Sequence, residues 1–283
     1  MLGGGGARGA AQVGVLQALF EAGVDAPTAI VGTSVGALNG SAIAAYPSLA
    51  GCLMLRELWL SREAAAVFKA HPLNILVSGL RRDRRSALPQ QNVMRLIQRA
   101  QTLSGIGSFE QLTVPLTVVA TDVNAGKPAL FKSGALVPAL LASTAIPGLF
   151  PAVRITDREH LDGGVVDNTP LDPAIADGAG QVIAISLMGG GEFEPSPQTL
   201  PELMARTLQL SLHHKMLSDF ERLRGTARIV VLCPVTAPTE TWEMKRSHVE
   251  QLIESSRHAT AMLLRQRGSK VFRHSAIHYL NLA

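Results

Sequence analysis

A serine between two glycines, in the pattern Gly32-x-Ser34-x-Gly36, has the spacing of a nucleophile on a sharp strand-to-helix turn. Such a turn lifts the serine side chain clear of the backbone, and glycines flank it because side chains there would collide. The first amides of the following helix point at the same place, where they can stabilise an oxyanion. The same five residues also fit a glycine-rich turn with an incidental serine, so other residues must decide.

A second glycine-rich loop, residues 4–9, begins the chain and leads directly into a helical pattern. It fits the Gly-x-Gly-x-x-Gly pattern of dinucleotide sites, and Asp25 follows at a suggestive distance. A dinucleotide site has no use for Ser34, however, and no Gly-Lys-Ser/Thr sequence follows to make a phosphate-binding loop. In the competing interpretation, the backbone amides of Gly5 and Gly6 form an oxyanion hole beside Ser34, because glycine lets a backbone approach a substrate oxygen closely.

A serine needs a base to become nucleophilic at neutral pH, and Asp162 is the candidate that the sequence favours. Two glycines follow Asp162 and leave an open approach to its carboxylate, whose pKa rises in a partly apolar pocket. Such a carboxylate can take the proton of Ser34 directly. Two alternatives stay open: Asp162 initiates an ordinary turn, or His248 or His258 completes a triad. None of the eight histidines lies in a context typical of a catalytic loop.

The composition of the 283 residues favours a folded protein with a sizeable core, because 47% are hydrophobic and only 17% are charged. No apolar stretch approaches the ~20 residues that a membrane-spanning helix needs, and no basic and apolar leader precedes the first motif. Cys52 and Cys233 stand far apart without metal-ligand spacing, and nothing else indicates a metal or an organic cofactor. We therefore expect a cytoplasmic protein that uses no cofactor.

A cluster of arginines stands out in a chain of net charge +4: Arg81, Arg82, Arg84 and Arg85. It fits a solvated loop, and the functional alternative is peripheral contact with the anionic inner face of a membrane. We do not expect nucleic acid as a partner, because no aromatic residues are interleaved and no nucleic-acid-binding motif accompanies the cluster.

Strand-like and helix-like patterns alternate from end to end of the chain. Apolar β-rich runs predict strands at residues 29–31, 116–120, 182–187 and 229–232. Helical patterns occupy residues 10–22, 37–45, 91–101, 138–143, 201–223 and 243–267. Continuous apolar strands separated by helices imply a largely parallel sheet with helices on both faces. Residues 73–89 are predicted to form an irregular excursion or lid, and residues 189–197 a loop after a strand.

Four blocks of sequence, in this order and spacing, resemble the bacterial patatin-like phospholipases: residues 3–9, 32–36, 142–151 and 161–170. Each block alone is weak, whereas all four in order are highly specific. The resemblance spans residues 3–187 and implies an α/β protein with a three-layer αβα fold, in which a mostly parallel central sheet lies between two layers of helices. We expect one domain over residues 1–283, with the core motifs in 3–187 and further helical and strand elements in 188–283.

The resemblance also implies a catalytic dyad without histidine, in which Ser34 is the nucleophile and Asp162 the proton acceptor. It implies an oxyanion hole from Gly4, Gly5 and Gly6, and an acyl-enzyme formed on Ser34 from a phospholipid or lysophospholipid. The remaining motif positions support the two loops, and Arg8 is expected to brace the first of them: Arg8, Gly9, Gly32, Gly36, Gly163 and Gly164.

Two features depart from the family pattern. Almost no strand precedes the glycine loop, so we expect either a trimmed start or a true start upstream, and a loose oxyanion hole. This departure motivates the alternative function, a catalytically weak or inactive relative that binds lipid or regulates. Gln12 stands where family members often carry histidine, with little expected consequence for the mechanism. Residues 146–150, an apolar loop with proline, are expected to line the acyl cleft or simply to pack.

Overall fold

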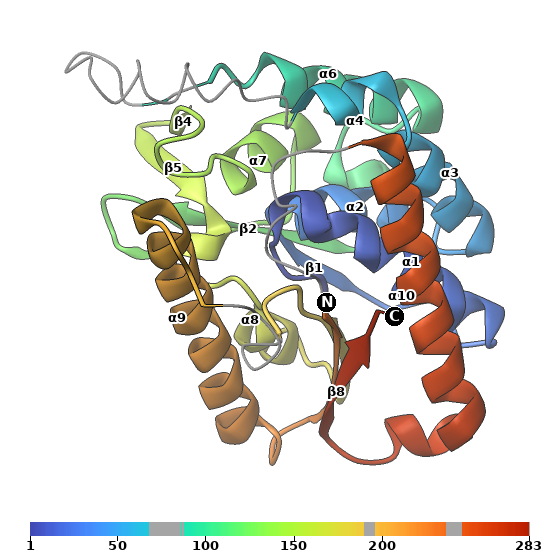
Figure 1. The fold of residues 1–283 in the computed structure, drawn as a ribbon. Coiled ribbons are helices and arrows are strands. Elements are labelled where there is room, and N and C mark those ends of the chain that lie inside the picture. The colour runs from blue at the N-terminus through green and yellow to red at the C-terminus, as the bar shows by residue number, and fades with distance from the viewer. Residues whose placement is uncertain (68–85, 87, 190–195, 236–244, 283) are drawn as a thin grey trace.

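The computed structural model describes residues 1–67, 86, 88–189, 196–235 and 245–282, and Figure 1 shows its elements. The strands are β1 (Ile30–Thr33), β2 (Leu116–Asp122), β3 (Lys127–Phe131), β4 (Val153–Ile155), β5 (Arg158–Asp162), β6 (Gln181–Ile185), β7 (Arg228–Val235) and β8 (Ala276–Asn281). The α-helices are α1 (Gly9–Glu21), α2 (Val35–Ala45), α3 (Leu49–Trp59), α4 (Arg62–Val67), α6 (Gln91–Ser104), α7 (Leu136–Ser143), α8 (Leu171–Ala176), α9 (Leu200–Leu223) and α10 (Arg246–Arg267). Short 3-10 helices are η1 (Gly6–Arg8), η2 (Phe109–Gln111), η3 (Gly163–Val165) and η6 (Gly268–Phe272).

The central sheet combines parallel and antiparallel pairings. β1 and β2 are parallel neighbours, and so are β6 with β7 and β7 with β8. The pairs β2–β3, β2–β5 and β4–β5 are antiparallel. β3 follows β2, and β5 follows β4, after only a few residues, and such short connections can join only antiparallel neighbours. The expectation of a largely parallel sheet is therefore correct for the strands that helices separate and wrong for β3, β4 and β5.

The first three residues of the chain lie between β1 and β6 and connect the two groups of strands. On one side the Leu2 N–H donates to the Val31 carbonyl at 2.9 Å, and the Leu2 carbonyl accepts from the Thr33 N–H at 3.1 Å. On the other side the Gly3 N–H donates to the Ile185 carbonyl at 2.9 Å. No full strand precedes the glycine loop, as the sequence indicates, but these three residues bond to the backbone on both sides and support the loop.

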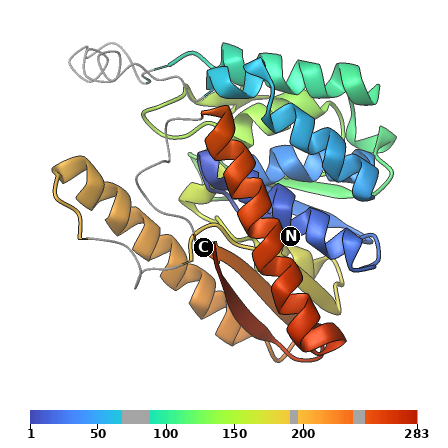
Figure 2. The ribbon, with the colours of Figure 1, turned by 45° about the vertical axis from the view of Figure 1, so that its right-hand side comes forward.

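Side chains alternate between the two faces of the sheet, as the two-residue period of a strand requires. In β1, Ile30 belongs to a buried cluster with residues of α1, α2 and α10, whereas Val31 belongs to a cluster with residues of α8 and α9. In β7, Val230 lies on the side of α1 and α10, and Val231 on the side of α8 and α9. Figures 1 and 2 show helices covering both faces of the sheet, which confirms the expected three layers.

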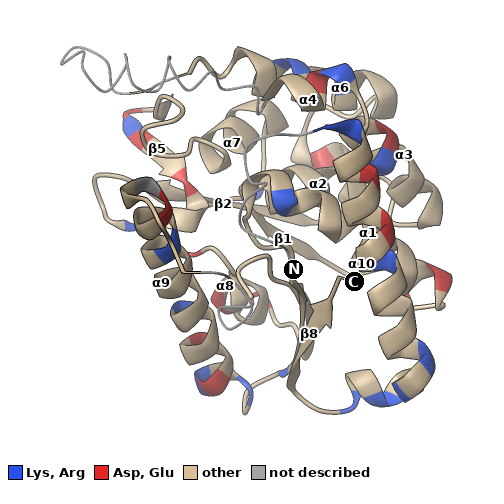
Figure 3. Ribbon diagram, in the orientation of Figure 1, with Lys and Arg blue, Asp and Glu red and all other residues tan. Residues whose placement is uncertain are grey.

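Charged residues lie mainly on the outer helices, and few lie on the central strands (Figure 3). The four arginines of the basic cluster lie outside the described residues: Arg81, Arg82, Arg84 and Arg85. The same holds for most residues of the two predicted loops, 73–89 and 189–197. Among the helices that the structure describes, none has both the length and the hydropathy that a bilayer span requires.

Candidate active site

Ser34 occupies a sharp turn between β1, which ends at Thr33, and α2, which begins at Val35. Its backbone has φ 56° and ψ −127°, in a region that side chains rarely adopt. Such a conformation costs about 1–3 kcal/mol and persists where the surrounding structure holds it. The structure thus has the strand-to-helix turn that the glycine spacing predicts.

Glycine is required on both sides of Ser34 because the start of α2 packs directly against neighbouring backbone. A methyl group on Gly36 would lie 2.6 Å from the Gly3 carbonyl oxygen, and one on Gly32 would lie 2.6 Å from the Gly36 carbonyl oxygen. Both distances are shorter than real Cβ contacts. The two glycines therefore let the turn close against residues 1–3, which lead into the glycine loop.

β2 brings the candidate base to the same place as the serine. Thr33 of β1 pairs with Val119 of β2, and Asp162 of β5 pairs with the next residue, Ala120. β1 and β5 share one edge of β2, because β3 occupies the other edge. The Ser34 hydroxyl therefore reaches Asp162 Oδ2 and donates a hydrogen bond of 2.5 Å to it, and both residues are buried.

The environment of Asp162 makes its carboxylate a stronger base than an exposed aspartate. Burial raises the pKa of this carboxyl to about 6, and hydrogen bonds from the Ser34 hydroxyl and the Gly164 N–H lower it only in part. Gly163 and Gly164 begin η3 directly after Asp162, and the Gly164 N–H bonds to Oδ1 at 2.7 Å. At pH 7 the carboxylate is mostly ionised and can accept a proton, as a general base must.

The C-terminal end of α7 holds both members of this pair. The Ser143 hydroxyl accepts a hydrogen bond from the Ser34 N–H at 2.8 Å and donates one to the Val119 carbonyl at 2.7 Å. The Ala145 carbonyl accepts from the Asp162 N–H at 2.9 Å. No role for Ser143 is predicted from the sequence, although its place in the Ala-Ser-Thr-Ala-Ile-Pro block is a signal that could have found it.

Replacement of Ser143 by alanine is expected to lower kcat for p-nitrophenyl butyrate about tenfold, with a smaller change in KM. The buried Ser34 N–H loses its acceptor, which costs about 1–3 kcal/mol, and the strained turn loses a contact that holds it. Steady-state rates check this, with Ser256→Ala as the control because Ser256 is a buried serine on α10. An equal loss of kcat in both variants would count against a positioning role.

The glycine loop approaches Ser34 most closely at Gly4. A methyl group on Gly4 would lie 3.1 Å from Ser34 Cβ and 2.5 Å from Asn168 Oδ1. The Gly4 N–H is already engaged, because it donates to the Asn168 carbonyl at 3.0 Å. Among the described residues, no acceptor is found for the N–H groups of Gly5 and Gly6. Of the three expected oxyanion donors, Gly5 and Gly6 are therefore the two that remain available.

Arg8 contacts the same loop. Its Nε donates to the Gly5 carbonyl at 3.4 Å, and its Nη2 lies 3.5 Å from the Met188 sulfur. Burial lowers the pKa of the guanidinium to about 10, so it stays charged at neutral pH. Gly9 follows and begins α1. The Arg8 side chain thus contacts the loop that it is expected to brace.

A buried chain of hydrogen bonds supports the base of the glycine loop. Gln12 Nε2 donates to the Gly3 carbonyl at 2.8 Å, and Gln12 Oε1 accepts from Asn39 Nδ2 at 2.9 Å. Asn39 Oδ1 in turn accepts from Trp59 Nε1 at 2.8 Å. Gln12, expected to have little consequence, thus fixes the carbonyl that precedes the loop. This role could not be predicted from the sequence, because the three side chains lie on three different helices, α1, α2 and α3.

The two histidines of the alternative triad, His248 and His258, lie on α10. That helix packs on the α1 side of the sheet, and His258 is exposed on it. In the part of the chain that the structure describes, the Asp162 carboxylate accepts from Ser34 and Gly164 and from no histidine. The geometry therefore favours direct proton transfer between Ser34 and Asp162 over the triad.

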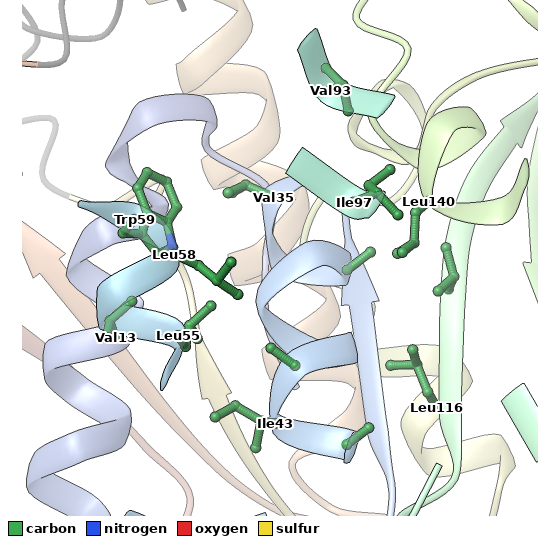
Figure 4. Close-up of a cluster of buried hydrophobic side chains, with 14 of the residues drawn as sticks. Val13, Val35, Ile43, Leu55, Leu58, Trp59, Val93, Ile97, Leu116 and Leu140 are labelled. Atoms are coloured by element: carbon green, nitrogen blue, oxygen red, sulfur yellow. The ribbon is translucent and has the colours of Figure 1, made fainter. Parts of the chain in front are cut away.

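An apolar cavity begins at Ser34 and extends between α2, α3, α4, α6 and α7. It is partly open to solvent, and its space counted together with that open part is about 1060 Å³. Figure 4 shows wall residues from four of these helices: Val35, Leu58, Ile97 and Leu140. Ile146 and Phe150 also lie in the wall, so the segment 146–150 lines this cavity as well as packing.

Residues 1–175 match the model of the family described as patatin-like phospholipase. The match covers more than half of the chain and includes the glycine loop, Ser34 and Asp162. The chain belongs to the patatin-like phospholipase family.

Relatives of the chain include bacterial and mammalian proteins. An uncharacterised NTE family protein of Mycobacterium tuberculosis is 34% identical over 216 residues, which cover 73% of this chain and 53% of that protein. The human patatin-like phospholipase domain-containing protein 6 is 32% identical over 204 residues, covering 69% of this chain and 14% of that protein. The chain thus spans about half the length of the mycobacterial relative.

Among solved structures, the type III effector ExoU of Pseudomonas aeruginosa matches 94% of this chain and 52% of its own, with a TM-score of 0.38 and 18% identity. A likeness of this degree supports no statement about the site.

Proposed function

We propose that this chain hydrolyses carboxylic esters of lipids, with phospholipids or lysophospholipids as substrates. The observation that carries the proposal is the 2.5 Å hydrogen bond from the Ser34 hydroxyl to the buried Asp162 carboxylate, beside an apolar cavity. A nucleophile in contact with its base, next to space for hydrocarbon, suits acyl transfer from a lipid. Membership of the patatin-like phospholipase family supports the same reaction.

In the first half of the reaction Asp162 takes the hydroxyl proton while Ser34 Oγ attacks the ester carbonyl carbon. The carbonyl oxygen becomes an oxyanion, and the N–H groups of Gly5 and Gly6 stabilise it together with the first amides of α2. When the tetrahedral intermediate collapses, the bond to the leaving alcohol breaks and Asp162 returns the proton to that alcohol. The acyl group remains on Ser34 as an ester.

In the second half a water molecule takes the place of the alcohol. Asp162 accepts a proton from this water, and the resulting hydroxide attacks the acyl carbon. Collapse of the second intermediate releases the fatty acid and returns the proton from Asp162 to Ser34 Oγ. The same carboxylate thus acts as base and acid in both halves, which a pKa near neutrality permits.

The alternative of an inactive lipid-binding or regulatory protein was motivated by the short segment before the glycine loop. That segment forms backbone hydrogen bonds with β1 and β6, and Gln12 holds the Gly3 carbonyl. A loop supported on these sides is suited to present fixed amides to an oxyanion. The observations therefore favour the hydrolase over the inactive module.

Covalent labelling tests the proposal directly. A fluorophosphonate probe is expected to modify Ser34, as mass mapping of the labelled peptide would show, and p-nitrophenyl butyrate is expected to give a burst of product. The burst reports an acyl-enzyme that forms faster than it is hydrolysed. Lipid binding without labelling of Ser34 and without ester hydrolysis would overturn the proposal in favour of the binding module.

A further inference from the structure

We propose that the cavity beside Ser34 holds one acyl chain, and that Ala42 and Ala45 on α2 set the longest chain that fits. The proposal rests on the hydrolase function proposed above and adds a chain-length limit to it. Three properties of the cavity carry it: its course along α2, the chemistry of its walls, and the small residues toward its far end.

The cavity follows α2 from its first turn to its last residue. Val35, Leu38, Ala42 and Ala45 line it, and their spacing of three, four and three places them on one face of the helix. At a rise of 1.5 Å per residue, the distance from the start to the end of this face is about 15 Å. A chain attached to Ser34 therefore has about 15 Å of helix face to follow.

α6 forms a second wall that runs in the same direction. Its lining residues extend from Val93 near its start to Ser104 at its end. The C-terminal ends of α2 and α6 meet, because the Tyr46 hydroxyl donates to the Ser104 carbonyl at 3.0 Å. Ser34 is therefore at one end of the cavity, and Ala45 is at the other end with Ser104.

The walls suit hydrocarbon, because their polar side chains are already hydrogen-bonded within the protein. Asn39 bonds to both Gln12 and Trp59. The Ser41 hydroxyl donates at 2.8 Å to a carbonyl within α2, and the Thr144 hydroxyl donates at 2.8 Å to a carbonyl of α7, the helix that it follows. Those lining side chains place no demand on a ligand for polar groups. An apolar chain thus matches the surface that lies beyond Ser34.

The length of this helix face determines how many carbons of an extended acyl chain can lie along it. An extended chain advances about 1.2 Å per bond, since a fully extended residue of three backbone bonds spans about 3.6 Å. A path of about 15 Å therefore holds about twelve carbons. Ala42 and Ala45 leave this end of α2 open, and a larger side chain at either position would shorten the path. Longer acyl chains have to bend or project beyond Ala45.

The experiment measures kcat/KM for p-nitrophenyl esters of 4, 8, 12 and 16 carbons, dispersed in the same nonionic detergent. For the wild-type chain we expect kcat/KM to rise about tenfold or more from 4 to 12 carbons, because each buried methylene adds favourable transfer free energy. From 12 to 16 carbons we expect no further rise.

Two variants change the far end in opposite directions. Ala45→Leu is expected to lower the ratio of kcat/KM for 12 over 4 carbons about tenfold, because the added side chain fills the path. Ile106→Ala removes a wall residue from the same end and is expected to raise the ratio for 16 over 12 carbons several-fold. The control is Ala205→Leu, the same substitution on the exposed side of α9, which leaves both ratios unchanged.

The ratios are measured within one preparation, so a partly unfolded variant does not change them, and Ile106→Ala decides if Ala45→Leu does not fold. If kcat/KM of the wild-type chain does not depend on acyl length, or if neither variant changes the ratios, the chain-length limit is overturned while ester hydrolysis still stands. If none of the four esters is hydrolysed in a way that requires Ser34, the proposed function itself fails.

Discussion

Replacement of Ser34 by alanine is expected to lower kcat/KM for p-nitrophenyl butyrate by at least about 10⁴-fold. The variant removes the one oxygen that both touches the Asp162 carboxylate and can form the acyl-enzyme. The residual rate would come from the oxyanion donors and the cavity acting on water alone. Initial rates on wild-type and variant protein, purified in the same way, give the ratio.

A matched serine variant separates this effect from general damage. Ser211→Ala removes a hydroxyl that bonds within the exposed part of α9, at 3.0 Å to the Thr207 carbonyl. It is expected to keep wild-type turnover and the wild-type melting temperature. Turnover retained by Ser34→Ala would refute the assignment of the nucleophile.

Replacement of Asp162 by asparagine is expected to lower kcat/KM about 10³- to 10⁴-fold, the size of effect seen when a catalytic aspartate is made neutral. The amide keeps the shape of the side chain and can still accept from the Gly164 N–H, but it cannot take the Ser34 proton. His248→Ala and His258→Ala are the controls, since both residues lie on α10. A large loss in either histidine variant would instead support a triad.

The pH profile carries a second signature of Asp162. Because burial raises the pKa of this carboxyl to about 6, the base is protonated and inactive below that pH and ionised above it. The kcat/KM of the wild-type chain is therefore expected to fall as pH decreases through about 6 and to level off above pH 7. Persistence of the same acid limb in the residual activity of Asp162→Asn would show that another group is responsible.

The middle of the sheet could be predicted from the sequence because its strands are buried on both faces. Four predicted strands correspond to β1, β2, β6 and β7, each a continuous apolar run. The six predicted helices correspond to α1, α2, α6, α7, α9 and α10, with ends that differ by a few residues. Apolar periodicity is strong enough in these segments to indicate both the type of element and its approximate bounds.

The strands β3 and β5 could not be predicted from their own composition. β5 has the sequence Arg-Glu-His-Leu-Asp, and only part of it is buried, so no apolar run marks it. β3 contains a proline and is largely exposed. Such segments become strands because β2 and their hairpin partners offer backbone groups to pair with, which is a property of the neighbours. The antiparallel part of the sheet was missed for this reason.

The same distinction separates the predictable part of the site from the rest. Ser34 and Asp162 lie in glycine-rich turns whose spacing carries a chemical signal. Ser143 and Gln12 act through single hydrogen bonds to backbone atoms of other elements, and no periodicity or spacing reports such a bond. Residues of this second kind are found only when the fold has brought the partners together.

The place of residues 1–3 in the middle of the sheet has a consequence for how the protein folds. Their contacts with β6 join positions 182 residues apart, so that a very long loop must close before they form. Contacts of this kind slow folding, because chain entropy is lost before the pairing compensates for it. During synthesis residues 1–3 thus leave the ribosome long before β6 and wait for it before they reach their final neighbours. The glycine loop becomes part of a working site only after β6 has been made.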